Sequence, residues 1–175
     1  MKKMKNSMKK KIAFLFAALM MTVVANAQFE QGKGYLGASA TSLDLSYSGI
    51  AKGHFGLGAR AGYFLADDWL ALGQLDYQKQ KDVPYKLTLG AGMRYYIVQN
   101  GLYMGASALF KHAKDYNDFL PSIQIGYAFF IGRTVTFEPE LFYEHSFKDH
   151  SNYSTAGIRI GVGVYLFKDQ YKIKK

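Results

Sequence analysis

The stretch VTFEPELFYEH, residues 135–145, alternates between two kinds of side chain. One face is apolar with Pro139 in its middle, and the other carries Glu138, Glu140 and Glu144. Successive side chains of a β-strand point to opposite sides, so this pattern predicts a strand with one broad apolar face and one acidic face. Either the acids face water around an apolar core, or they face inward while the apolar side meets lipid.

The N-terminal segment has the composition of an export signal. Residues 1–11 contain six lysines and no acidic residue, residues 12–24 form an apolar run, and Ala25-Asn26-Ala27 has the small-x-small pattern of a signal-peptidase site. The apolar run is shorter than the roughly 20 residues of a membrane-spanning helix. We therefore expect a secretory signal peptide over residues 1–27, cleaved after Ala27, and a single domain over residues 28–175.

Cleavage of this signal would change the charge of the chain. The whole sequence has 22 basic and 13 acidic residues and a formal net charge of +9, but six of the basic residues lie in the signal. The remaining chain would carry only +3, which removes the main support for nucleic-acid binding. The sequence has no cysteine, so no disulfide stabilises the exported chain. No cofactor is predicted.

After residue 33 the sequence contains eight alternating runs and no amphipathic helical pattern. The breaks between the runs alternate between tight turns rich in Asp, Asn and Gly and longer polar segments. This layout predicts an all-β fold, an eight-stranded antiparallel up-and-down barrel over residues 34–167. The expected strands cover about residues 34–45, 54–65, 69–78, 85–97, 102–112, 119–131, 134–146 and 153–167.

The second face of each run mixes glycine with large polar and charged residues. When neighbouring runs are folded about the centre of their turn, the mixed faces coincide, with large residues opposite glycine and acids opposite bases. A slip of one residue would have flipped one whole face, so this agreement supports the strand assignment. The expected cross-strand pairs are Glu140–Arg159, Phe142–Gly157, Asp76–Lys86, Leu72–Gly90, Arg60–Gln74, Arg94–Gly105 and Glu140–Gly126.

Two orientations of this wall agree with the alternation. In a soluble lipocalin-like barrel the apolar face would point inward and bind an apolar ligand, but glycines on the water-facing side would weaken the strands. In a transmembrane barrel the mixed face would fill a narrow lumen, where glycines make room for large side chains, and the apolar face would meet lipid. Aromatic residues near both ends of the apolar face favour the transmembrane orientation. They are Tyr63, Trp69, Tyr95, Phe129 and Phe137 toward the tight turns, and Phe55, Tyr77, Tyr85, Phe110 and Tyr143 toward the long loops.

Charged residues inside such a lumen must be paired, because an isolated buried charge is costly. We expect a structural network of acids and bases there, and no catalytic residues. Pro139 lacks a donor for the strand ladder, so a bulge or a missing hydrogen bond is expected at that position. The expected network consists of Arg60, Asp76, Lys86, Arg94, Glu138, Glu140, Glu144 and Arg159.

The signal peptide, the eight runs, VTFEPELFY at 135–143 and the closing GIRIGVGVYLF at 157–167 together resemble the small outer-membrane β-barrel proteins of the OmpA/OmpX/OmpW-like group. This resemblance implies insertion into a Gram-negative outer membrane by the barrel-assembly machinery, with membrane lipid as a partner. It also implies short periplasmic turns and longer extracellular loops. Many members end on a phenylalanine, whereas here Phe167 is followed by a basic tail, residues 168–175. We expect a monomer with a structural or surface-interaction role.

Two other functions are compatible with this pattern. A narrow gated path for ions or small solutes could run through the charged lumen, although a filled interior disagrees with a wide pore. A Ser/His/acid group at the long-loop end could act on outer-leaflet lipids. The residues concerned have no fixed spacing, so neither a catalytic nor a metal site is predicted from them. They are His54, His112, His145 and His150, near Asp115, Glu144, Asp149 and Ser151.

Overall fold

The computed structural model describes residues 29–46, 49–50, 55–80, 83–97, 101–113 and 116–166. The expected signal peptide and the tail after Phe167 lie outside these residues, as do His54 and Asp115. Within the described ranges, no helix has the length and apolar character that a membrane span requires.

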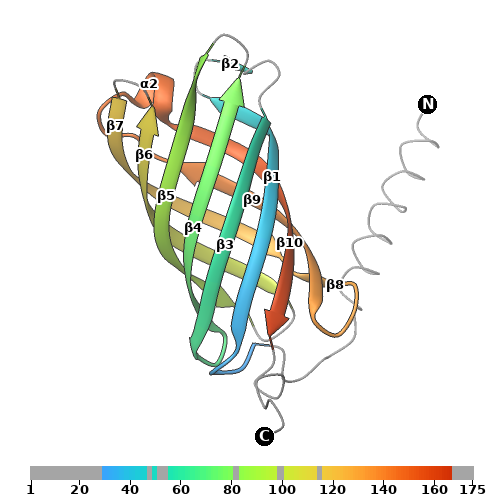
Figure 1. Ribbon diagram of the computed structural model, residues 1–175. Coiled ribbons are helices and arrows are strands. Elements are labelled where there is room, and N and C mark those ends of the chain that lie inside the picture. Colours follow the sequence, from blue (N-terminus) through green and yellow to red (C-terminus); the bar gives the residue numbers. More distant parts are fainter. Residues whose placement is uncertain are drawn as a thin grey trace, which may run out of the picture.

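Eight long antiparallel strands form a closed barrel around one lumen (Figure 1). The wall follows the order β1, β3, β4, β5, β6, β7, β9, β10, and the pairing of β10 with β1 closes it. The short strand β2 and the helix α2 lie at the long-loop end, whereas β8 lies at the tight-turn end (Figure 1). The elements are β1 (Gly34–Ser46), β2 (Gly49–Ile50), β3 (Phe55–Ala66), β4 (Trp69–Gln80), β5 (Val83–Tyr96), β6 (Leu102–Ala113), β7 (Tyr116–Tyr127), β8 (Phe129–Phe130), β9 (Val135–Glu144), α2 (His150–Tyr153) and β10 (Thr155–Leu166).

The wall has its apolar face outside and its charged face inside. On β10, Ile160 and Val162 are each 48% exposed, whereas Arg159 is 2% exposed. On β9, Leu141 is 56% exposed and Glu140 is 2% exposed. The alternation of these strands therefore has the polarity of a transmembrane barrel, the opposite of a soluble barrel with an apolar core.

Most of the expected strand registers are confirmed. They hold across the β9–β10 hairpin and across all three tight turns, between β3 and β4, between β5 and β6, and between β7 and β9. Because side chains alternate along a strand, a register shifted by one residue would have placed polar groups on the apolar face. The confirmed pairs are Glu140–Arg159, Phe142–Gly157, Arg60–Gln74, Arg94–Gly105 and Glu140–Gly126.

The register between β4 and β5 was predicted wrongly by two residues. The two strands extend to Gln80 and from Val83, so they reach into the expected loop 79–84, and the pairing shifts between Gln78 and Gln80. Folding the hairpin about the centre of the expected loop cannot anticipate such an irregularity. The observed pairs are Asp76–Thr88, Leu72–Gly92 and Gln78–Lys86, in place of Asp76–Lys86 and Leu72–Gly90.

The ladder is interrupted opposite Pro139. β7 pairs with β9 from Ser122 to Gly126, and β8 continues the pairing with Phe129 opposite Phe137. Both stretches share one register, so the proline produces a gap in the ladder and no bulge. Proline has no N–H to donate, which explains the gap.

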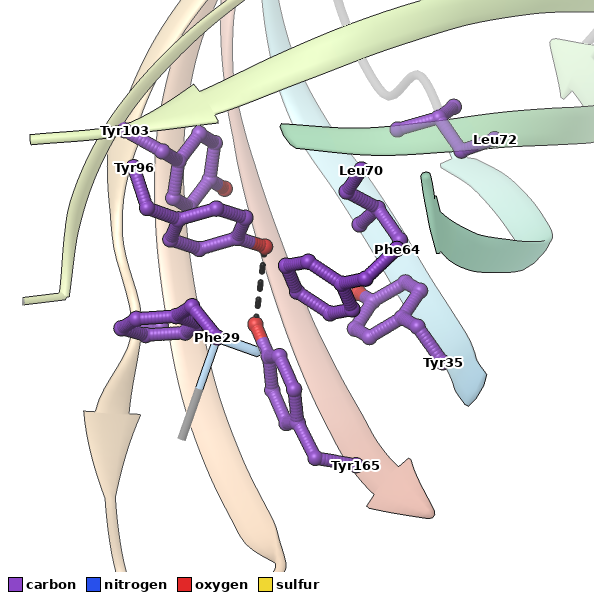
Figure 2. Packing of buried hydrophobic residues seen from close by; sticks show 9 residues of the cluster. Phe29, Tyr35, Phe64, Leu70, Leu72, Tyr96, Tyr103 and Tyr165 are labelled. Carbon is purple, nitrogen blue, oxygen red and sulfur yellow. Dashed lines mark hydrogen bonds between the residues drawn. The ribbon is translucent and has the colours of Figure 1, made fainter. Parts of the chain in front are cut away.

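Buried apolar side chains gather at the tight-turn end of the lumen (Figure 2). Phe29, which precedes β1, stacks on Tyr96 with ring centroids 4.0 Å apart and planes 16° apart. Above this cluster the lumen is filled mainly by polar and charged side chains. The cluster contains Phe29, Tyr35, Phe64, Leu70, Leu72, Tyr96, Tyr103, Ala128 and Tyr165.

Candidate functional site: the charged lumen

Glu140 is the centre of the charged lumen. Arg60 donates two hydrogen bonds to its carboxylate, from Nη1 to Oε2 at 3.0 Å and from Nη2 to Oε1 at 2.8 Å. Arg159 Nη1 donates to Oε1 at 2.7 Å, and Arg94 Nη2 donates to Oε2 at 2.9 Å. The Tyr103 hydroxyl also donates to Oε2, at 3.0 Å. One carboxylate on β9 therefore ties together β3, β5, β6 and β10.

Glu138, two residues earlier on β9, holds the part of the network nearest the tight turns. Arg94 Nη1 donates to its Oε2 at 3.0 Å, and the Tyr35 hydroxyl donates to the same oxygen at 2.8 Å. Thr136 Oγ1 and the Tyr165 hydroxyl donate to Oε1, at 2.7 Å and 3.2 Å. Arg94 thus bridges Glu138 and Glu140 with its two terminal nitrogens.

Glu144 extends the network toward the long loops. Lys111 Nζ lies 2.8 Å from Glu144 Oε2, and Arg159 Nη2 lies 3.6 Å from Oε1. Arg159 therefore faces both Glu140 and Glu144. The three carboxylates form one line along β9, because residues two apart on a strand point to the same side.

Burial makes the pairing of these charges essential. The Arg94 side chain is 0% exposed, and removing an ion from water costs several kcal/mol unless partners compensate. Besides its carboxylate partners, the Arg94 guanidinium lies 4.2 Å from the centroid of the Tyr103 ring, and that of Arg159 lies 4.2 Å from the centroid of Phe142. Such contacts with aromatic faces add further stabilisation to a desolvated cation.

Glycines make the room for these large side chains. A Cβ on Gly126 would overlap the Tyr103 hydroxyl, and a Cβ on Gly163 would overlap a carboxylate oxygen of Glu138. Glycine on the inward face is therefore a packing requirement of a narrow, filled barrel, which agrees with the interpretation of the sequence.

Six of the eight residues expected in the network contact one another through the bonds described above. The other two, Asp76 and Lys86, are not opposite each other. Asp76 is buried and its Oδ2 accepts a hydrogen bond from Gln74 Nε2 at 3.2 Å. Lys86 Nζ lies 5.5 Å from the centroid of the Tyr153 ring, toward the long loops.

Five members of the network were not predicted from the sequence, namely Lys111 and the hydroxyl donors Tyr35, Tyr103, Thr136 and Tyr165. Their position along the strands could have identified them as residues that face the lumen. Lys111 and Tyr103 share the inward parity of Gly105 on β6, and Thr136 shares that of Glu138 on β9. Charge alone does not mark a tyrosine or threonine as a partner of a buried carboxylate.

A second polar cluster lies at the long-loop end, below α2. Asp118 Oδ2 accepts hydrogen bonds from Ser146 Oγ and from the Tyr116 hydroxyl, both at 2.6 Å. Ser154 Oγ lies 2.6 Å from His150 Nδ1 and accepts a hydrogen bond from Ser146 N at 2.9 Å. Ser154 is 2% exposed. The serine closest to a histidine is therefore buried and engaged in holding the loop.

The other histidines considered for a hydrolase have different partners. His112 Nδ1 lies 2.6 Å from Asn117 Oδ1, and His145 Nδ1 lies 3.1 Å from the Tyr143 hydroxyl. Glu144 faces the lumen, where it binds Lys111. Among the residues that the structure describes, no three His, Cys, Asp or Glu side chains are placed to hold a metal ion.

Comparison with known proteins finds similarity in structure and none in sequence families. No family model matches the chain, and no curated protein matches it. The N-terminal β-barrel domain of Pseudomonas aeruginosa OprF superposes with a TM-score of 0.58 at 16% identity, covering 78% of this chain and 98% of that one. Neisserial surface protein A gives 0.53 at 16% identity, covering 77% and 97%. A de novo designed transmembrane β-barrel gives 0.52 at 14% identity, covering 78% and 98%. The chain therefore has the fold of the small eight-stranded outer-membrane β-barrels.

Proposed function

We propose that this chain is an integral outer-membrane protein, a monomer whose lumen is filled by paired charges and whose role is structural or in surface interaction. The observation that carries the proposal is the inverted polarity of the wall. Leu89 is 60% exposed and Ile123 is 62% exposed, whereas Arg94 and Glu140 are buried. A continuous apolar band of this kind is unfavourable in water and is solvated by acyl chains in a bilayer.

The dimensions of the wall support the same proposal. The long strands contain 10 to 14 residues, and about 9–11 residues suffice for a tilted strand to cross the hydrocarbon core. Aromatic residues stand on the outer face toward both ends, where amphipathic rings favour the membrane–water interface. They include Tyr63, Trp69 and Tyr95 toward the tight turns, and Tyr77, Tyr85, Phe110 and Tyr143 toward the long loops.

The proposed route to the membrane rests on the export signal in the sequence and on the resemblance to the small outer-membrane β-barrel proteins. Export by the signal over residues 1–27 and insertion by the barrel-assembly machinery would place the tight turns in the periplasm and the longer loops outside the cell. Outer-membrane lipid is then the partner of the apolar face.

The contents of the lumen argue against two alternatives. A lipocalin-like carrier needs an apolar cavity. Beyond the apolar cluster at the tight-turn end, however, the interior holds Arg60, Arg94, Arg159, Glu138 and Glu140. A wide pore needs an open lumen, and these side chains fill an eight-stranded barrel. In planar bilayers we therefore expect no steady conductance in the nanosiemens class.

Gel mobility tests the proposal directly. A membrane fraction containing the chain is run on SDS gels with and without boiling, and the soluble periplasmic fraction is run beside it. We expect the chain in the membrane fraction, with a different mobility before and after boiling, because the closed barrel resists SDS until it is heated. Recovery in the soluble fraction, or steady nanosiemens conductance, would contradict the proposal.

A further inference from the structure

A residue that precedes the barrel wall packs into the cluster at the tight-turn end of the lumen. Phe29 precedes β1, yet its side chain is 0% exposed. Its ring stacks on Tyr96 at 4.0 Å and meets Tyr165 edge-on at 5.6 Å and 73° (Figure 2). Phe64 and Phe130 complete the enclosure, with ring centroids 6.1 Å and 5.9 Å from that of Phe29. We call these four rings, Phe64, Tyr96, Phe130 and Tyr165, the turn-end socket.

The backbone after Phe29 is fixed to the turn between β3 and β4. Asp68 N donates to Phe29 O at 2.7 Å. Gly32 N donates to Phe64 O, and Phe64 N donates to Lys33 O, both at 2.9 Å. Gly32 has a φ of 89°, a backbone conformation that residues other than glycine rarely adopt.

Gln31 of the same segment adds two more bonds to the end of β3 and the turn after it, one from its backbone and one from its side chain. Gln31 N donates to Asp67 Oδ1 and Gln31 Nε2 donates to Leu65 O, both at 2.8 Å. Side-chain pockets combined with main-chain hydrogen bonds are one way in which folded domains recognise a peptide segment. The segment 29–33 is therefore held against the end of β3 and the turn after it by specific hydrogen bonds.

The socket lies next to the charged lumen. The Tyr96 and Tyr165 hydroxyls are 2.9 Å apart (Figure 2), and the Tyr165 hydroxyl donates to Glu138 at 3.2 Å. Tyr103, whose ring centroid is 5.4 Å from that of Tyr96, donates to Glu140. A single side chain, that of Tyr165, thus lies between the ring of Phe29 and the carboxylate of Glu138. Water that entered there would weaken them, because charges attract less strongly in a medium of high dielectric constant.

We propose that the turn-end socket is a binding site for an aromatic residue of the chain's own N-terminal segment, and that residues 29–33 act as a plug that separates the charged lumen from solvent at the tight-turn end. With cleavage after Ala27, as the sequence predicts, Phe29 is the second residue of the exported chain. The proposal depends on the contacts of the barrel and not on its location in a membrane.

Thiol labelling tests the plug, because the chain has no cysteine of its own. Thr136 is buried and pairs with Phe130 of the socket, so Thr136→Cys places a thiol just inside it. The refolded chain in detergent is treated with a charged methanethiosulfonate reagent, in the Phe29 background and with Phe29→Ala. We expect labelling at least tenfold faster with Phe29→Ala, and slow labelling with Phe29→Tyr, which keeps the ring. Arg133→Cys, on the exposed turn, should label equally in all backgrounds.

Equal labelling of Thr136→Cys with Phe29 and with Phe29→Ala would overturn the proposal. The gel shift on boiling shows separately whether each variant has formed the barrel. If Phe29→Ala does not fold, hydrogen exchange of the unmodified chain decides. The Asp68 amide donates to Phe29 of the plug, and the Gly32 amide of the plug donates to Phe64. We expect both amides to exchange at least tenfold more slowly than the amide of exposed Arg133. Exchange as fast as that of Arg133 would refute the plug.

Discussion

Glu140→Gln is the sharpest test of the charged lumen. The substitution keeps the shape of the side chain but removes its charge and replaces one acceptor oxygen by an NH₂ group. If the NH₂ takes the place of Oε1, it faces Arg60 Nη2 and Arg159 Nη1, which are both donors. If it takes the place of Oε2, it faces Arg60 Nη1, Arg94 Nη2 and the Tyr103 hydroxyl. No rotation of the amide satisfies these donors.

The cost follows from these contacts. At least two charge-assisted hydrogen bonds are lost, each of which contributes about 1.5–3 kcal/mol. Breaking a buried ion pair by removing one partner costs about 3–5 kcal/mol in other proteins. We therefore expect Glu140→Gln to lower the free energy of unfolding by about 3–5 kcal/mol, a large part of the roughly 5–15 kcal/mol typical of folded domains.

The assay is equilibrium unfolding by urea in lipid vesicles, followed by the fluorescence of Trp69, the single tryptophan. Trp69 lies on the outer face and is 42% exposed, so its emission reports the transfer from lipid to water. Glu30→Gln is the matched control, since Glu30 is 50% exposed and pairs with Lys33 at 3.3 Å. Lys33 is only 7% exposed, but the Glu30 carboxylate stays half in water, so we expect this single pair to contribute less than the fully buried Glu140 with its three arginines. If Glu140→Gln costs no more than Glu30→Gln, the reasoning about buried charges is wrong.

Three further predictions concern the wall and a turn. Gly92→Ala should destabilise the barrel by about 1–3 kcal/mol, because the new Cβ would overlap Ser107 Oγ and lie 2.5 Å from a backbone oxygen, whereas Gly132→Ala, with nothing within 4 Å, should be neutral in the same urea titration. Leu89→Arg should lower the stability in vesicles by about 2–4 kcal/mol if this 60% exposed side chain faces the bilayer midplane, and an unchanged midpoint would speak against lipid contact. Asp68→Asn should raise stability at neutral pH. Burial raises the pKa of the Asp68 carboxyl above its usual value. The folded state therefore favours the neutral carboxyl, and the stability that this contributes is present below the usual pKa and is lost as the pH rises through the raised pKa. Asparagine stays neutral and also tolerates the φ of 64°. A stability difference between the two chains that does not grow from acid to neutral pH would contradict this assignment.

The polarity of the strands could be predicted from the sequence because alternation is a local property. Ile160 and Arg159 are adjacent, so they must point to opposite sides of any strand that contains both. The inward glycines then indicated which side is crowded. The same parity predicted the pairing of Glu140 with Arg159 across a hairpin, because a regular connection fixes the register.

The tight-turn end could not be predicted in this way. Phe29 lies in no alternating run, and its place between Tyr96 and Tyr165 depends on three segments that are distant in the sequence. The register of Asp76 was also beyond reach, because an irregularity between Gln78 and Gln80 displaces the pairing.

The sequence by itself determined the number of long strands, the two faces of each strand and most of the charges that share the inner face, although not Lys111. Apart from the hairpin pair Glu140–Arg159, only the closed barrel decided which charges meet, because Glu140 also binds Arg60 on β3 and Arg94 on β5, strands that are not neighbours of β9 in the wall. The physical reason is the range of the two effects. Side-chain direction is set between neighbouring residues, whereas contacts through the interior are set by the closure and stagger of the whole wall.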